Sequence, residues 1–148
     1  MNSRLDETTV TAWVRLVRAQ QVLLERVEAE LKKAGLPPLR WYDVLLELHR
    51  AGSKGLRQFE IGAAVLLSKH NVSRLLDRLE KEKLLERYVC EEDGRGARVK
   101  ITTAGRELRR RMWPVYSAAI AEHFAQHYTK TELRQLAGLL GRLFGVAR

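Results

Sequence analysis

The chain has little of what secreted and membrane-bound proteins need. Its single cysteine, Cys90, excludes a disulfide within the chain and favours a reducing compartment, so we interpret it as a structural or incidental thiol. No apolar run approaches the ~20 residues of a membrane-spanning helix, and the opening segment, MNSRLDETTV, lacks the apolar region of a signal peptide. We therefore expect a cytoplasmic protein with no membrane partner.

Catalytic signatures are also missing. The sequence contains no Gly-rich phosphate loop, no nucleophile elbow and no His-Glu-x-x-His motif. Internal repeats and low-complexity linkers are absent as well, and 148 residues suffice for one domain that buries roughly 70% of its unfolded surface. We expect a single-domain protein that is not an enzyme and has no cofactor.

Positive charge is in excess. Lys and Arg number 27 against 18 Asp and Glu, which gives a formal net charge of +9 and a pI near 10.1. This balance favours a polyanionic partner, either nucleic acid or an acidic membrane surface. Basic surfaces that bind nothing share it, so the charge alone does not decide the function.

The segment from His70 to Arg87, HNVSRLLDRLEKEKLLER, has the pattern of an amphipathic helix. Apolar residues at i, i+3, i+4 and i+7 form one stripe: Val72, Leu75, Leu76 and Leu79. Polar residues project from the opposite side: His70, Ser73, Arg74 and Asp77. Ser68 is a good N-cap, so the first turn would present backbone N–H groups and short polar side chains together, as a DNA-reading helix requires.

After Arg87 the period changes to that of two short strands around an Asp-Gly-Arg-Gly turn, Asp93 to Gly96. The turn would place Arg95 at the tip of this hairpin and Arg98 just beyond it. A helix with an exposed polar face, followed by a hairpin with exposed arginines, predicts a winged helix-turn-helix.

These residues resemble the DNA-binding core of the MarR (multiple antibiotic resistance regulator) family of bacterial transcription factors. The resemblance lies in Val72 to Arg87, in the Asp-x-Arg of the hairpin (Asp93 and Arg95) and in the strand-to-helix junction ITTAG, Ile101 to Gly105. With the flanking helices it extends over nearly the whole chain.

Two features depart from the family pattern. Lys83 stands where the family usually has Gly before the hairpin, and the turn Val65-Leu66-Leu67 is unusually apolar. The first departure would shift the end of the helix by a residue, and neither threatens the fold.

Helical patterns fill the rest of the chain. We expect a long first helix over 9–33, ended by Gly35, and a second helix over 37–50 that begins at prolines. The second helix would turn Trp41, Val44, Leu45 and Leu48 toward a core. A short third helix would span 58–66, a long helix capped by Thr102 or Thr103 would follow the hairpin, which ends near Ile101, and a last helix would begin with a capping box at Thr129 to Glu132.

The expected fold is therefore mainly α with a small β-hairpin wing (α+β), a winged helix-turn-helix with long N- and C-terminal dimerisation helices. One MarR-like domain would span 1–148, with the winged helix-turn-helix lobe at 36–105 and dimerisation helices at 1–35 and 106–148. A winged helix needs only about 80 residues, so the apolar stripes at both ends of the chain need another surface that covers them. A homodimer would supply it, and the resemblance implies interlocking terminal helices; the alternative is that these helices pack on their own subunit.

The DNA contacts can be assigned residue by residue. Arg74 could reach guanine O6/N7 or a phosphate, and Lys69 would supply charge to a phosphate. Arg95 suits the minor groove, and the family's Asp-x-Arg implies that Asp93 holds its guanidinium. Asp77 has the wrong sign for phosphate, so we expect it to orient an arginine. The predicted DNA-binding residues are Ser68, Lys69, His70, Asn71, Ser73, Arg74, Arg78, Asp93, Arg95 and Arg98.

The three tryptophans lie on helices that, in the resembled family, enclose a pocket. Aromatic walls suit a flat organic acid or phenol, and His49 or Arg15 could pair with its carboxylate. The predicted ligand-binding residues are Trp13, Arg15, Trp41, His49 and Trp113. The alternative is that all three tryptophans are plain core.

His123 and His127 have i, i+4 spacing with Glu122 beside them, which on a helix would place two imidazoles on one face. A zinc site needs further ligands, which would come from Glu25, Glu28, Glu30 or a partner subunit. We favour a surface or interface histidine pair and predict no metal.

Together these patterns predict a homodimeric, sequence-specific regulator that binds a pseudo-palindromic operator in double-stranded DNA, most simply a repressor relieved by a small aromatic or phenolic effector. Two alternative functions also involve DNA: a metal-responsive regulator that uses His123 and His127, and a non-specific architectural DNA-binding protein. A third alternative is a basic protein-interaction module that binds no DNA.

Overall fold

The computed structural model describes residues 4–89 and 97–145, and these fall into two compact units. One unit is Leu31–Val115, called the lobe below. The other combines Met1–Glu30 with Tyr116–Arg148 and is called the terminal unit. The predicted domain bounds, with a lobe at 36–105, stay a prediction.

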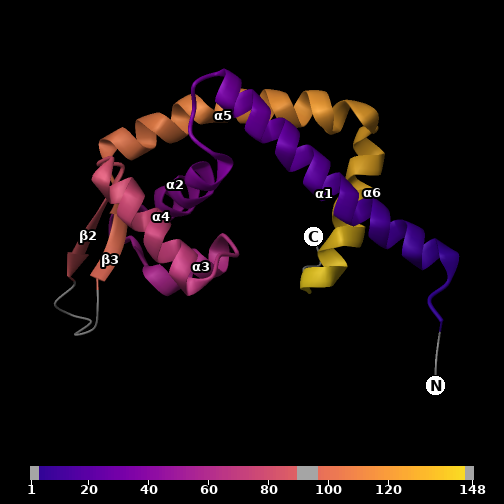
Figure 1. Ribbon diagram of the computed structural model, residues 1–148, viewed down its shortest axis with the longest axis horizontal. Helices are drawn as coiled ribbons and strands as arrows, with labels where there is room; N and C mark the ends of the chain where they lie inside the picture. Colours follow the sequence, from indigo (N-terminus) through magenta and orange to yellow (C-terminus); the bar gives the residue numbers. More distant parts are fainter. Residues whose placement is uncertain (1–3, 90–96, 146–148) are drawn as a thin grey trace. The chain divides into compact units, whose positions relative to one another are not determined.

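The lobe holds the winged helix-turn-helix, as predicted. Its elements are α2 (Leu39–Ala51), β1 (Leu56–Arg57), α3 (Gln58–Ala64), α4 (Lys69–Lys81), β2 (Leu85–Val89), β3 (Ala97–Ile101) and the first part of α5 (Thr103–His123). The three strands form an antiparallel sheet in the order β1-β3-β2. Figure 1 shows β2 and β3 side by side. Pairing of Leu85 with Ile101 and of Val89 with Ala97 confirms the hairpin, while the short β1 was not predicted.

The core of the lobe is built from the apolar stripes of α2, α4 and α5 and from the inward residues of β3. Val44, Leu45 and Leu48 of α2 are fully buried as predicted. Trp41 is only partly buried, and the adjacent Tyr42 faces the core instead. On α4 and later elements the buried residues are Val72, Leu76, Leu79, Leu84, Leu85, Val99, Ile101, Leu108 and Met112.

The helix that begins at Lys69 ends earlier than its sequence pattern suggested. It stops at Lys81, and β2 begins at Leu85, so the expected change of period after Arg87 was wrong. Lys83 has φ +61°, and the amide N–H groups of Lys83 and Leu84 donate to the carbonyls of Glu80 and Leu79. This is a Schellman ending with lysine where glycine is preferred. Leu84 and Leu85 can then turn into the core.

Thr102 joins the end of the hairpin to α5. Its hydroxyl accepts from the Gly105 N–H at 3.0 Å and donates to the Lys83 carbonyl at 2.7 Å. A Cβ at Gly105 would collide with the Leu84 carbonyl oxygen and lie 2.7 Å from Cγ1 of Ile101. Glycine is therefore required at this junction because the first turn of α5 packs directly against the turn after α4.

The terminal unit contains α1 (Glu7–Lys33), the end of α5 and α6 (Lys130–Gly141). The predicted capping box is confirmed: Thr129 Oγ1 accepts from the Glu132 N–H, and the Glu132 carboxylate accepts from the Thr129 N–H. These hydrogen bonds, the backbone one foremost, lower the pKa of Glu132. Among the described residues, none of the helices combines the length and the apolar character needed to cross a membrane.

Most of the apolar stripe on α1 is exposed. Val27 is buried, with only 5% of its surface exposed, but Trp13 is 65% exposed. None of the residues of α6 is buried. Other large apolar side chains exposed in this unit are Val10, Val14, Leu16, Val17, Leu24, Leu139, Leu143 and Phe144. The unit therefore leaves much of its apolar surface without cover in one copy of the chain.

The left-handed conformation of Lys83 predicts an unusual stabilising substitution. A non-glycine residue at φ +61° costs about 1–2 kcal/mol, partly offset by the greater freedom of glycine in the unfolded chain. Lys83→Gly should therefore raise the free energy of unfolding by about 1 kcal/mol in urea denaturation. Lys81→Gly, two residues earlier in helical conformation, is the matched control and should lower it. A destabilising Lys83→Gly would contradict the strain argument.

Candidate nucleic-acid interface

The first turn of α4 presents the features expected of a DNA-reading helix. The Ser68 hydroxyl accepts from the Asn71 N–H at 3.3 Å and caps the helix, as predicted. Ser68, Lys69, His70, Asn71 and Arg74 are all exposed, while Ser73 is half-buried. The helix N-terminus carries a partial positive charge, so cationic and hydrogen-bonding groups are gathered on one exposed face.

Asp77 on the same face is neutralised by an arginine that sequence reasoning missed. Arg87 of β2 contacts the Asp77 carboxylate at 2.8 Å and the Glu80 carboxylate at 3.1 Å. The expectation that Asp77 orients an arginine is confirmed, and that arginine is Arg87. No regular spacing joins a helix to the strand after it, so the sequence offered no signal for the partner.

The strands of the wing carry further cations. Lys100 of β3 contacts the Glu86 carboxylate at 3.2 Å and lies 5.2 Å from the centroid of the Tyr88 ring. Arg98 is half-buried and lies opposite Arg57 and Tyr88 in the sheet register. Asp93 and Arg95, like Cys90, lie outside the described residues, so the roles predicted for them stay predictions.

Arg78 is placed differently from Arg74. Its guanidinium carbon lies 6.0 Å from the centroid of the Trp41 ring on α2, a cation–π distance. Arg74, one turn earlier, is exposed as Arg78 is, but its guanidinium has no such contact with an aromatic ring among the described residues. Of the two arginines, Arg74 is thus the one better placed to reach a ligand in front of the helix.

The apolar turn between α3 and α4 has a structural explanation. Val65 is buried, and its carbonyl accepts from the Arg40 guanidinium at 2.6 Å. Leu66 has φ +55° and is 85% exposed, while the Leu67 N–H closes the turn on the Gly62 carbonyl at 3.0 Å. Left-handed, non-glycine residues therefore occur just before and just after α4.

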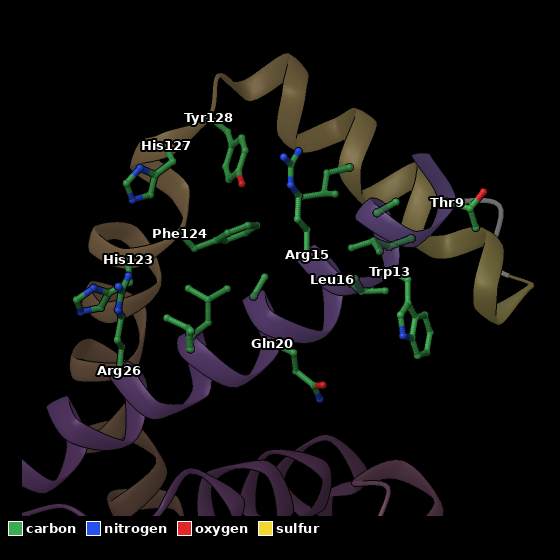
Figure 2. Close-up of a pocket in the computed structure, with 16 residues that line it drawn as sticks. Thr9, Trp13, Arg15, Leu16, Gln20, Arg26, His123, Phe124, His127 and Tyr128 are labelled. Carbon is green, nitrogen blue, oxygen red and sulfur yellow. The ribbon is translucent and has the colours of Figure 1, made fainter. Parts of the chain in front are cut away.

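The predicted effector residues divide between the two units. In the lobe, Trp113 stacks on Tyr42 with ring centroids 6.0 Å apart and keeps 46% of its surface exposed. In the terminal unit, Trp13 and Arg15 line a groove of about 890 Å³ between α1, the end of α5 and α6, where Phe124 and Tyr128 point toward α1 (Figure 2). Since no tryptophan is buried, the alternative that all three are plain core was wrong.

His49 sits among arginines. Desolvation is the main cause that lowers the pKa of His49, and the positive charges of Arg109, Arg106 and Arg110 on α5 lower it further. His49 is therefore neutral at pH 7 and offers a carboxylate a hydrogen bond, while the positive charge nearby comes from the arginines.

The geometric premise of the predicted histidine pair was wrong. α5 ends at His123, Phe124 leaves the helical conformation at φ −128°, and His127 closes a short 3₁₀ turn, Ala125–His127. The i, i+4 spacing therefore does not place both imidazoles on one helix face. His123 lies instead beside Glu30 of α1 and Glu122.

Comparison with known proteins agrees with this geometry. Residues 34–96 match the model of the MarR family. The HTH-type transcriptional regulator YkoM of Bacillus subtilis is 30% identical over 124 residues, which cover 84% of this chain and 79% of YkoM. The chain belongs to the MarR family of winged-helix transcriptional regulators. The relatives named here are transcriptional regulators.

Solved structures of the family share the fold. The MarR regulator Sco3205 of Streptomyces coelicolor, solved in complex with DNA, has a TM-score of 0.88 at 22% identity and covers 97% of this chain and 89% of its own. CouR of Rhodococcus jostii, solved with p-coumaroyl-CoA bound, has a TM-score of 0.73 at 27% identity and covers 86% of this chain and 87% of its own.

The contact between Arg87 and Asp77 should be measurable as a coupling free energy. A double-mutant cycle of Arg87→Ala and Asp77→Ala should give about 0.5–1 kcal/mol, because Asp77 is largely exposed but the Arg87 side chain is only 25% exposed. The exposed pair Arg110 and Glu107 is the matched control and should give about 0.3 kcal/mol or less. Equal coupling in the two cycles would contradict a special role for Arg87.

Proposed function

We propose that this MarR-family protein is a homodimeric repressor that reads a pseudo-palindromic operator and is released by a small aromatic or phenolic ligand. The observation that carries the proposal is the Ser68-capped N-terminal face of α4, on which Arg74 and Lys69 are exposed while the nearby Asp77 is neutralised by Arg87. The DNA complex of Sco3205 supports a DNA-binding role for this fold.

The proposed DNA contacts follow from the width of the major groove, which admits an α-helix. α4 enters the major groove with its first turn, where Arg74 reaches a guanine edge and Lys69, His70, Asn71 and Ser73 contact bases or phosphates. The wing approaches the minor groove through Arg95, oriented by Asp93, while Arg98 adds positive charge.

The proposed dimer follows from the uncovered apolar surface of the terminal unit. Trp13, Leu139 and Phe144 are 65%, 53% and 74% exposed, and such large exposed apolar side chains within one unit are typical of an interaction surface. A second copy of the chain would cover them and would place two α4 helices for two half-sites roughly one helical turn (~34 Å) apart.

Release by a ligand requires two conformations with different spacing of the α4 helices. A ligand that binds better to the conformation with the wrong spacing weakens operator binding by its differential affinity. The partly exposed rings of Trp41 and Trp113, with His49 and its neighbouring arginines, support a flat, acidic ligand. The aromatic thioester bound to CouR supports the same ligand class.

Substitutions on α4 should separate base reading from bulk electrostatics. Arg74→Ala should cost roughly 1–3 kcal/mol of operator binding and relax base preference, because a bidentate contact to guanine is lost. Lys69→Ala should weaken operator and random DNA alike and lower the salt slope by about one. Fluorescence anisotropy on both DNAs over a salt series measures these quantities.

The architectural alternative makes the opposite prediction for these variants. If Arg74→Ala and Lys69→Ala lose operator and random DNA equally, α4 does not read bases, and the protein is a non-specific DNA-binding protein. Circular dichroism and melting curves of both variants provide the folding control, because exposed positions usually change stability by only about ±0.5 kcal/mol.

The dimer should respond to charge on the exposed face of α6. The wild-type protein should have a mass of about 34 kDa by light scattering, twice the 17.0 kDa of one chain. Leu139→Asp should shift it toward the monomer, because Leu139 would have to bury a carboxylate. Ala137→Asp, an exposed position on the opposite side of the same helix, is the matched control and should stay dimeric. A monomeric wild type at micromolar concentration would contradict the dimer.

A further inference from the structure

Three metal-ligating side chains converge in the terminal unit. Glu30 of α1 and Glu122 and His123 of α5 each offer a ligand atom, and these atoms all lie within 4.8 Å of one another. The Nε2 atom of His123 lies 4.0 Å from the Glu30 carboxylate and 3.9 Å from the Glu122 carboxylate. Glu30 and Glu122 come from helices far apart in the sequence, so the fold and not local spacing brings these groups together.

The Nε2 atom of His123 in this cluster has no hydrogen-bond partner among the residues that the structure describes. Nε2 of His123 is shielded from solvent, and both carboxylates are too distant to accept a hydrogen bond from it. A buried polar atom without a partner costs roughly 1–3 kcal/mol, so such atoms call for an explanation. A ligand that bonds to Nε2 and to both carboxylates at once removes this cost.

The geometry points to a site for a divalent transition-metal ion held by Glu30, Glu122 and His123. Bonds of about 2.0–2.2 Å from imidazole nitrogen and carboxylate oxygen place two ligand atoms of one tetrahedral ion about 3.4 Å apart. The separations of 3.9 and 4.0 Å around Nε2 exceed that distance by about half an ångström, and all three ligand atoms lie within 4.8 Å of one another, so side-chain rotations that draw the carboxylates inward bring them into coordination range.

The ligand types define the class of ion. One imidazole with two carboxylates suits zinc and other first-row divalent ions, while the absence of thiolate from this trio disfavours the soft ions. Three protein ligands leave coordination positions for water, which is typical of open sites and not of closed structural ones. The side chain of Glu122 is 66% exposed, so an ion can enter from solvent.

Zinc binding to the chelator-treated full-length protein tests the site directly. Competition with a chromophoric chelator should show one Zn²⁺ per chain, and His123→Gln and Glu122→Gln should each weaken binding at least about tenfold. His127→Gln and Glu25→Gln are the matched controls, a second histidine and a second α1 carboxylate outside the trio, and should leave affinity within about twofold. Glu122→Gln decides the matter if His123→Gln fails to fold, because Glu122 is largely exposed.

Two further readouts distinguish a built site from loose surface binding. Co²⁺ should give visible d–d absorption bands in the wild type that disappear in Glu122→Gln and persist in His127→Gln. Saturating Zn²⁺ should raise the melting temperature of the wild type by several degrees and leave that of Glu122→Gln unchanged, since the ligands join α1 to α5. No Zn²⁺ uptake at micromolar concentration, or equal uptake by Glu122→Gln and the wild type, would overturn the site. Neither outcome bears on DNA binding.

Discussion

The turn after α4 is the constraint on which the lobe depends. Lys83 reverses the chain in a left-handed conformation, and the carbonyls of Lys83 and Leu84 accept hydrogen bonds from the side chain and the N–H of Thr102. Gly105 leaves room for the Leu84 carbonyl against α5. One small cluster of backbone groups therefore ties the end of α4 to the base of the hairpin and to the start of α5. The orientation of α4 relative to the hairpin follows from this junction.

Ion pairs add a second link between the hairpin and α4. Arg87 of β2, next to the junction, contacts two carboxylates on α4, so it ties the hairpin to the helix and neutralises negative charge on the exposed face of α4. If α4 meets the phosphates of DNA as proposed, this pairing reduces the repulsion that Asp77 and Glu80 would otherwise cause.

The sequence predicted the parts of this arrangement that depend on period and on local hydrogen bonding. The stripe on α4, the Ser68 cap and the capping box at Thr129 are all short-range patterns, and the structure confirms them. It did not predict β1, which is a two-residue strand without a period, or the partner of Asp77, which comes from another element. The helix end at Lys81 was missed because Leu84 and Leu85 continue an apolar pattern that a strand and a helix can share.

The same distinction explains the predicted metal and ligand residues. Histidines at i, i+4 share a helix face only if the helix runs through both of them. Here α5 ends at His123, and Phe124 leaves the helical conformation before His127. The cluster that forms instead uses Glu30, about 90 residues earlier in the chain, and so depends on how α1 packs against α5. Periodicity states which face of a helix is apolar or polar but never what lies opposite that face. Tertiary packing chooses the partners, and for this reason the sites that join distant segments are the ones that the sequence alone reveals least.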